Sequence, residues 1–160
     1  MPTLPQLIEE DIGELNHALQ ELLVKSDATS ALVIDKGGFI ITQSGRFQDL
    51  DTITLCALSA ASFAATESIA TLVGEQNFSS IYQQGEHASL LVMNVDQYCL
   101  LSVVFKATLS VGAIKYYAAD TITKIAAQLK RAQNRAPGAG IDLSMLNLAD
   151  PSAIFKMKVA

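Results

Sequence analysis

The chain has 160 residues, half of them apolar, and a net charge of −5 with only 11 basic side chains. This length suits one domain, and the apolar content supports a large core. The scarcity of basic residues argues against a nucleic-acid-binding protein, which would present a basic face.

The first predicted element is a helix from Leu4 to Val24 or Lys25. Thr3 can cap its start with a side-chain oxygen, and Pro5 is tolerated in a first helical turn. Apolar residues recur every three or four positions and predict one narrow buried seam. The members of this seam are Ile8, Ile12, Leu15, Leu19 and Leu22.

Two short strands and a turn follow. Ala31–Asp35 is apolar, and Phe39–Gln43 returns as its partner. Residues 36–38, Lys-Gly-Gly, form the turn, because glycine supplies the positive φ that a tight hairpin requires. The next loop, Ser44–Leu50, is polar and carries Arg46.

The stretch Thr52–Val73 predicts a long central helix in which Glu67 is the only charged residue. Asp51 or Thr52 can cap its start, and Gly74 stands where a left-handed residue ends a helix. Small and apolar residues fall on two stripes, of which one should lie on the sheet and the other needs a partner. The stripes are Ile53, Ala57, Ala60, Ala64 and Ser68, and Leu55, Leu58, Ser62, Ala65, Ile69 and Leu72.

The length of this helix also raises the alternative of a membrane span, which needs about 20 predominantly apolar residues. Several of its residues are polar, and Glu67 near the middle would cost roughly 2.5 kcal/mol or more in hydrocarbon. We therefore expect no membrane insertion. The small residues of the helix instead permit close approach of another helix.

Three further strands and a helix complete the predicted domain. Ser79–Gln84 alternates weakly and is polar, which suits an edge strand. Ser89–Asn94 and Tyr98–Lys106 are almost continuously apolar, so both of their faces should be covered. The last helix, Val111–Ala132, has one buried stripe, formed by Val111, Ile114, Ala118, Ile122, Ile125 and Leu129.

The order helix, strand, strand, helix, strand, strand, strand, helix indicates an α+β fold. Because no helix connects most strand pairs, the five-stranded sheet should be antiparallel, with helices covering both faces. Residues 1–133 are the predicted domain, and residues 134–140 a linker by their proline and glycine content. Residues 141–160 form an appended segment rich in apolar side chains, which docks either on its own domain or on a partner.

The residues that carry chemistry form no catalytic or metal-binding pattern. His17 and His87 are the only histidines, and although Glu86 is able to orient His87, no nucleophile has a suitable setting. No Walker-type glycine loop with a lysine is present, so we expect no nucleotide site and no cofactor. Cys56 and Cys99 lie in apolar runs, which predicts buried free thiols. These thiols, together with an N-terminus unlike a signal peptide, lead us to expect a cytoplasmic protein.

Arg46 leaves two interpretations open. It is one of three arginines and lies just before the central helix. It is either an arginine finger inserted into another protein's phosphate site or a solvated loop residue. Asp49 and Asp51 nearby are better explained by turn and capping roles than as a carboxylate pair.

An ordered series of segments carries a family likeness. These are VIDKGGFIITQSG (33–45), LDTITLCALSAASFAATESIATLVGE (50–75), NFSSIYQQG (77–85) and LLSVVFKATLSVGAIKYYA (100–118). The series resembles the roadblock-domain family, and within it the bacterial gliding-regulator branch typified by MglB. The likeness covers about Ser30 to Arg131 and leaves the last twenty residues outside.

The resemblance implies a three-layer roadblock-like fold and a homodimer in which edge strands join two sheets and the central helices pair. It also implies a platform for a small Ras-like GTPase of the MglA type. The platform would favour GTP hydrolysis by positioning the GTPase's own residues, without an inserted arginine. By position, the implied GTPase-binding residues are Ser59, Ser62, Phe63, Thr66, Glu67 and Ala70, to which we add Arg46. The predicted dimer-interface residues are Ala61, Ala65, Ser68, Ser80 and Tyr82. Glu67 and Ser68 depart from the small or glycine-like residues typical there.

Three hypotheses for function follow. The leading one is a GTPase-activating homodimer, which is a regulator rather than an enzyme. The second is a scaffold of the same fold in motility, polarity or signalling, which binds a GTPase without accelerating it. The third is a small-molecule sensor, which would need a polar-lined pocket, whereas the predicted strands are filled with Leu, Val and Met.

Overall fold

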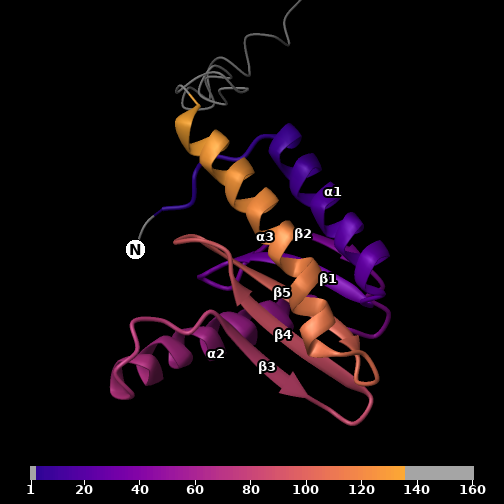
Figure 1. Cartoon of the computed structure of the whole chain (residues 1–160). Coiled ribbons are helices and arrows are strands. Elements are labelled where there is room, and N and C mark those ends of the chain that lie inside the picture. The colour runs from indigo at the N-terminus through magenta and orange to yellow at the C-terminus, as the bar shows by residue number, and fades with distance from the viewer. Residues whose placement is uncertain (1–2, 136–160) are drawn as a thin grey trace, which may run out of the picture.

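The computed structural model describes residues 3–135, and its elements follow the predicted order. Three helices and five strands are present in this part of the chain (Figure 1). They are α1 (Glu9–Ser26), β1 (Ser30–Asp35), β2 (Ile40–Gly45), α2 (Thr52–Leu72), β3 (Ser80–Gln84), β4 (Ala88–Asn94), β5 (Cys99–Lys106) and α3 (Val111–Asn134).

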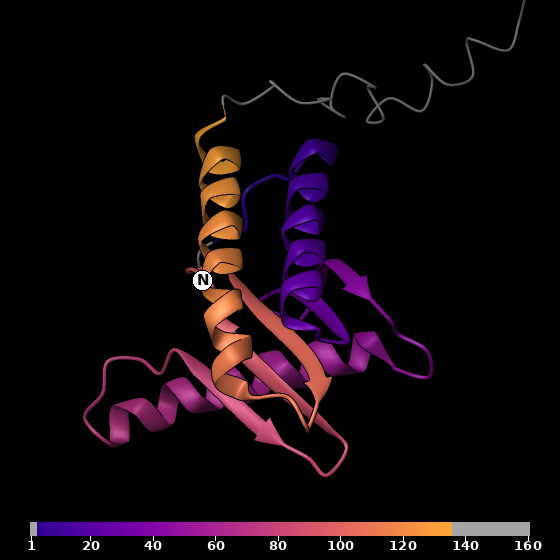
Figure 2. The same ribbon diagram turned by 45° about the vertical axis from the view of Figure 1, so that its right-hand side comes forward.

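The sheet is antiparallel throughout, with the strand order β2-β1-β5-β4-β3. Helices α1 and α3 lie side by side on one face, and α2 crosses the other face, as Figure 2 shows from a second side. The predicted α+β fold with three layers is therefore confirmed. Strand β3 is at one edge, as its polar composition predicted, and β2 is at the other.

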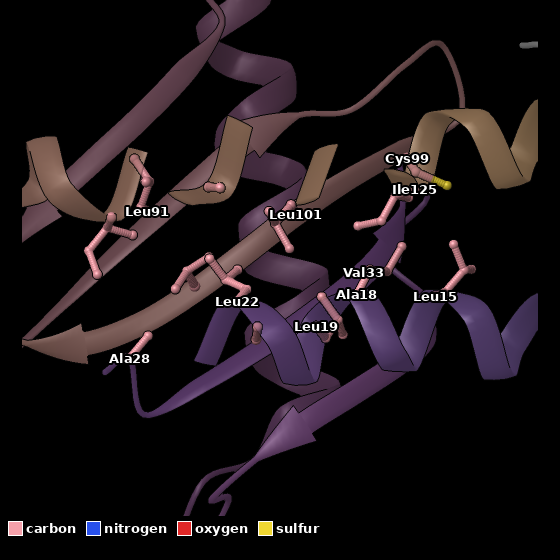
Figure 3. Packing of buried hydrophobic residues seen from close by; sticks show 14 of the residues in the cluster. Leu15, Ala18, Leu19, Leu22, Ala28, Val33, Leu91, Cys99, Leu101 and Ile125 are labelled. Carbon is pink, nitrogen blue, oxygen red and sulfur yellow. The ribbon is translucent and has the colours of Figure 1, made fainter. Parts of the chain in front are cut away.

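Alternation along the strands divides the core into two parts. Leu101 and Val103 of β5 point toward α1 and α3, and Leu101 lies opposite Val33 of β1. Figure 3 shows Val33 and Leu101 gathered with Leu19 of α1 and Ile125 of α3. The intervening residues face α2 and form the second part of the core. These include Leu32, Ile34, Val92 and Leu100. Both faces of the central strands are covered, as their continuous hydrophobicity predicted.

Helix α1 starts later than predicted. Residues 3–8 are not helical, and Ile8 rather than Thr3 is the N-cap residue. The backbone N–H of Ile8 donates to the carboxylate of Asp11 at 2.9 Å, which replaces a cap from a preceding side chain. Because residues 3–8 are not helical, Leu4 and Leu7 reach the edge of the core and pack against it.

The other two helices end close to the predicted positions. Asp51 caps α2 by accepting a hydrogen bond from the backbone N–H of Thr54 at 3.1 Å, and Gly74 has the expected positive φ of 78°. Helix α3 continues to Asn134, so the predicted linker 134–140 begins inside it. The remaining linker residues after 135, and the predicted appended segment 141–160, lie outside the described residues.

Asp11 joins the start of α1 to the end of α3. Its carboxylate is fully buried and accepts hydrogen bonds from Arg135 Nη1 and Nη2 at 2.8 Å each, and from Gln128 Nε2 at 2.7 Å. The hydrogen bonds from Arg135 hold the pKa of Asp11 well below its usual range, although burial alone would raise it. This cluster fixes the end of the described chain to the first turn of α1.

We predict that Asp11→Asn lowers the free energy of unfolding by about 1–3 kcal/mol at neutral pH, because it leaves the buried partners without a charged acceptor. A lowered pKa contributes stability that is complete above the ordinary carboxyl pKa of about 3.9 and is lost as the pH falls below it. Urea titrations at about pH 7 and pH 2.5 should therefore show the difference from wild type shrinking in acid. Glu14→Gln, at an exposed acid of α1, is the control. If Asp11→Asn lowered the free energy of unfolding equally at both pH values, this account would be contradicted.

Both cysteines are free and buried, as predicted. Burial raises the pKa of Cys56 to about 11 and that of Cys99 to about 12. At neutral pH both side chains are therefore protonated thiols, which are poor nucleophiles. Neither cysteine is a candidate for covalent chemistry.

Candidate functional site: the exposed face of helix α2

Helix α2 leaves most of its apolar surface uncovered. Ile53 is 76% exposed, Leu58 is 62% exposed and Leu72 is 84% exposed, although α2 is the most apolar of the three helices. Large apolar side chains with this exposure are rare in a helix that has found all its partners, and together they indicate an interaction surface. We therefore treat this face as the candidate functional site.

The buried line of α2 differs from both predicted stripes. It consists of Cys56, Ser59, Ala60, Phe63 and Ala70, and only Ala60 belongs to a predicted stripe. The helix rests on the sheet through Phe63, its one aromatic side chain, which rotates both predicted stripes toward the flanks. One face is covered and the other is not, as expected, but the covered face is neither of the two predicted stripes.

By length and hydropathy alone, α2 is the one helix within residues 3–135 that would be able to cross a membrane. Its only charged residue, Glu67, forms an ion pair with Lys36 of the β1–β2 turn, with Nζ and Oε1 3.6 Å apart. One face of α2 already packs on the sheet, and its charge is paired with a neighbouring turn. Both features suit a helix that packs against protein.

Three of the predicted GTPase-binding residues are not on the surface. Ser59, Phe63 and Ala70 are buried, so the expectation that they are exposed was wrong. Their spacing of four and seven residues places them on one side of a helix, the side that faces the core. The other three predicted positions on this helix are exposed or half-buried, and they are Ser62, Thr66 and Glu67.

Arg46 is exposed but lies apart from these residues. Its backbone N–H donates to the carbonyl oxygen of Thr29 at 3.1 Å, just before β1, whereas Lys36 beside Glu67 follows the end of β1. Since Thr29 and Lys36 flank the six residues of β1, seven residue steps apart, the two places are separated by roughly 23 Å along the strand. Within one protomer, the structure does not bring Arg46 together with Glu67.

The predicted dimer-interface residues lie on α2 and on β3. Ala61, Ala65 and Ser68 are exposed on the helix, while Ser80 and Tyr82 are half-buried on the strand. The Tyr82 ring stacks on Phe105 with centroids 6.1 Å apart, so this side chain contributes to its own core. What β3 offers at the sheet edge is its backbone, which among residues 3–135 pairs with β4 on one side only.

An apolar groove runs between α2 and β3. Its volume is about 310 Å³, and its walls are mostly aliphatic. The lining residues are Leu55, Leu58, Ser59, Ser62, Ile81, Gln83, Leu90 and Val92. We call it the edge-side groove. Leu55, Leu58 and Ser62 belong to one of the two predicted stripes, so the helical spacing carried part of this signal, whereas the contribution of β3 and β4 was missed.

A second groove runs along the opposite side of α2, beside the β1–β2 and β4–β5 turns. It consists of two adjoining hollows of about 500 and 380 Å³ that share Lys36, Phe63, Glu67 and Gln97. Gly38, with φ 94°, brings the β1–β2 turn so close to α2 that a Cβ there would lie 3.0 Å from Ala57 Cα. We call it the turn-side groove. Sequence reasoning missed it, because it is formed by segments that are distant in the chain.

The grooves on both sides of α2 are surfaces suited to docking. Residues 3–135 contain no group of three or more His, Cys, Asp or Glu side chains that would hold a metal ion. His17 lies on α1, 3.3 Å from Glu21, and His87 is exposed in the β3–β4 turn, so neither histidine belongs to a catalytic group. The arrangement suits binding of another polypeptide.

Comparison with known proteins agrees with this architecture. The Roadblock/LC7 domain model matches residues 14–105, more than half of the chain. No curated protein gave a match. Among solved structures, an MglB with a tetrameric arrangement is 27% identical, with a TM-score of 0.76 over 82% of this chain and 99% of its own.

Two further structures have the same fold. The gliding protein MglB of Thermus thermophilus is 27% identical, with a TM-score of 0.74 over 82% of this chain and 99% of its own. Myxococcus xanthus MglB is 24% identical, with a TM-score of 0.75 over 82% of this chain and 98% of its own. The resemblance to the MglB branch inferred from the ordered segments is thereby confirmed.

Proposed function

The chain belongs to the Roadblock/LC7 domain family, and from this premise we propose that it is a homodimeric regulator of a small Ras-like GTPase. The observation that carries the proposal is the uncovered apolar face of α2 beside the free edge of β3. Similarity to structures of MglB also supports this proposal. The partner we propose is a GTPase of the MglA type.

The dimer is proposed to form along β3 and the edge-side groove. A free strand edge is a template for pairing with another strand, and antiparallel pairing of two copies of β3 would join the sheets. Leu58 and the neighbouring aliphatic side chains of the groove would then pack against the second α2. A stable interface buries roughly 800 Å² per partner, which an exposed helix of 21 residues with an adjacent strand is large enough to supply.

Two adjacent α2 helices would form the platform for the GTPase. Many outward side chains there are small, which lets another backbone approach closely, the large ones such as Leu58 and Leu72 are apolar, and Glu67 is the only charge on the helix. We propose that the GTPase binds in its GTP state and that contact with the platform positions its own catalytic residues. Within residues 3–135, no side chain pattern suggests a nucleophile or a metal site of its own.

Binding to a GTP-loaded GTPase of the MglA type tests this proposal, and Ala64→Arg tests the surface. Ala64 is exposed on α2, so we expect its replacement to lower affinity about a hundredfold or more, the effect of a central interface residue. Ala119→Arg, an equivalent change at an exposed alanine of α3, should leave affinity unchanged. Affinity is measured by titration with GTP-loaded and GDP-loaded GTPase.

Thermal melting of both variants serves as the folding control. Normal melting and normal affinity of Ala64→Arg would show that the platform lies elsewhere. Equal, negligible affinity of the wild-type protein for both nucleotide states would contradict the proposed function itself.

A further inference from the structure

The turn-side groove combines an apolar floor with an acidic rim. Its apolar lining, which we call the floor, comes from four segments of the chain, with Ala60 and Phe63 both on α2, and consists of Leu4, Phe39, Ala60, Phe63 and Leu100. The charged residues around it are three carboxylates, from Asp35, Glu67 and Asp96, and one ammonium group, from Lys36. The groove therefore suits an occupant with both apolar and basic side chains.

The acidic residues retain capacity for such an occupant. Asp35 Oδ1 accepts from the backbone N–H of Phe39 at 3.0 Å, and Asp96 Oδ1 accepts from those of Tyr98 and Cys99 at 2.8 and 2.9 Å. Neither carboxylate forms an ion pair with a cation inside the described range 3–135. The one lysine at the rim is already paired with Glu67.

The chain's own C-terminal sequence has this composition. Residues 152–160 read SAIFKMKVA and contain two lysines and no acidic side chain. From Phe155 to Val159 apolar and basic residues alternate. Because successive side chains of an extended chain point to opposite sides, such a sequence is able to present Phe155, Met157 and Val159 to a floor and both lysines to a rim.

The point where the described chain ends also favours this occupant. Arg135 is bound to Asp11, which accepts from the backbone of Ile8, and Leu4 of the groove lies only four residues before Ile8. Four residues span at most about 14 Å, whereas the 16 residues between Arg135 and Ser152 reach about 50 Å when extended. The tether is therefore long enough to bring the segment to the groove.

We propose that residues Ile154–Val159 occupy the turn-side groove of their own domain. Phe155 and Met157 would cover the floor over Phe63, and Lys156 and Lys158 would pair with the rim carboxylates. This site is distinct from the edge-side groove, where the dimer is proposed to form, and its existence does not depend on a GTPase.

The test is carbodiimide crosslinking of the full chain, which joins a lysine amine directly to a carboxylate, followed by peptide mass spectrometry. We expect amide links from Lys156 or Lys158 to Asp35, Glu67 or Asp96. Phe155→Ser retains every reactive group but removes the apolar anchor, so it should lower the yield of these links about tenfold or more. Leu143→Ser, an equivalent change elsewhere in the C-terminal sequence, should leave the yield unchanged.

Two further measurements make the outcome decisive. The link between Lys124 and Glu21, an ion pair of α3 and α1, should form equally in all variants and reports on the fold. An equimolar mixture of ¹⁵N-labelled and unlabelled protein separates links within one chain from links between copies. No links to the rim, links unaffected by Phe155→Ser, or links only between copies would each overturn docking within the chain.

Discussion

Replacing Leu58 by arginine is expected to convert the proposed homodimer into a monomer. Leu58 lies in the exposed part of α2 and lines the edge-side groove with Ile81 and Leu90. In a dimer joined along β3, an arginine there would bring two guanidinium groups, one from each copy, into an apolar contact region. Loss of the apolar contact and burial of an unpaired charge both oppose association, so we expect the dissociation constant to rise a hundredfold or more, about 2.7 kcal/mol.

Light scattering behind a sizing column measures this change directly. The wild-type protein should elute at about twice the chain mass of 17.1 kDa at micromolar concentration, and Leu58→Arg should elute at the monomer mass. Val24→Arg is the matched control, because Val24 is 85% exposed on α1, in the opposite layer. If the wild-type protein were monomeric, or if Leu58→Arg stayed dimeric, the edge-side groove would not be the dimer interface.

Leu101→Ala is expected to lower the free energy of unfolding by about 2–5 kcal/mol, the range for truncating a core leucine. Leu101 is fully buried in the central strand β5, opposite Val33 on one side and Met93 on the other. Helices α1 and α3 cover it, so the removed atoms would leave a cavity that no neighbouring segment is free to fill.

Urea unfolding followed by circular dichroism measures this loss, at fixed protein concentration because dimerisation would add to stability. Val24→Ala truncates an aliphatic side chain that is already in water, so its effect should stay within about 0.5 kcal/mol. If both substitutions produced similar small effects, the central position of β5 would be wrong.

Much of the fold was predictable because its signals are local. The almost continuous apolar residues of Ser89–Asn94 and Tyr98–Lys106 predicted strands covered on both faces, and β4 and β5 lie inside the sheet. Asp51 and Gly74 marked the ends of α2, since capping depends on neighbouring residues only. The start of α1 was missed because its cap is not a preceding side chain: the backbone N–H of Ile8 donates to Asp11, whose carboxylate is held by Arg135, 124 residues later in the chain.

The sequence predicted that helix α2 would have an uncovered face, but not which residues would form it. The composition of α2 indicated that one face would lack a partner within the chain, and Ile53, Leu58 and Leu72 are exposed. Both predicted stripes consisted of small and apolar residues, so the pattern did not decide which side would bury. Phe63 packs on the sheet, and Ser59 and Ala70, which were expected at the surface, lie on the same side of the helix and are buried as well.

Arg46 separates two mechanisms of GTPase regulation. An arginine finger contributes about 10³–10⁵ in rate, so its removal would abolish stimulation. If the platform positions the GTPase's own residues, Arg46→Ala should change the stimulated rate by less than about tenfold, or 1.4 kcal/mol of barrier. The exposed loop position of Arg46, away from Glu67, favours the smaller effect.

Single-turnover hydrolysis of GTP by an MglA-type GTPase, with and without this protein in excess, tests the central claim most directly. We predict that both the wild-type protein and Arg46→Ala accelerate hydrolysis. Loss of acceleration in Arg46→Ala with binding intact would identify a finger instead of positioning. Binding of the GTP state by the wild-type protein without any acceleration would contradict the activating role and leave a scaffold.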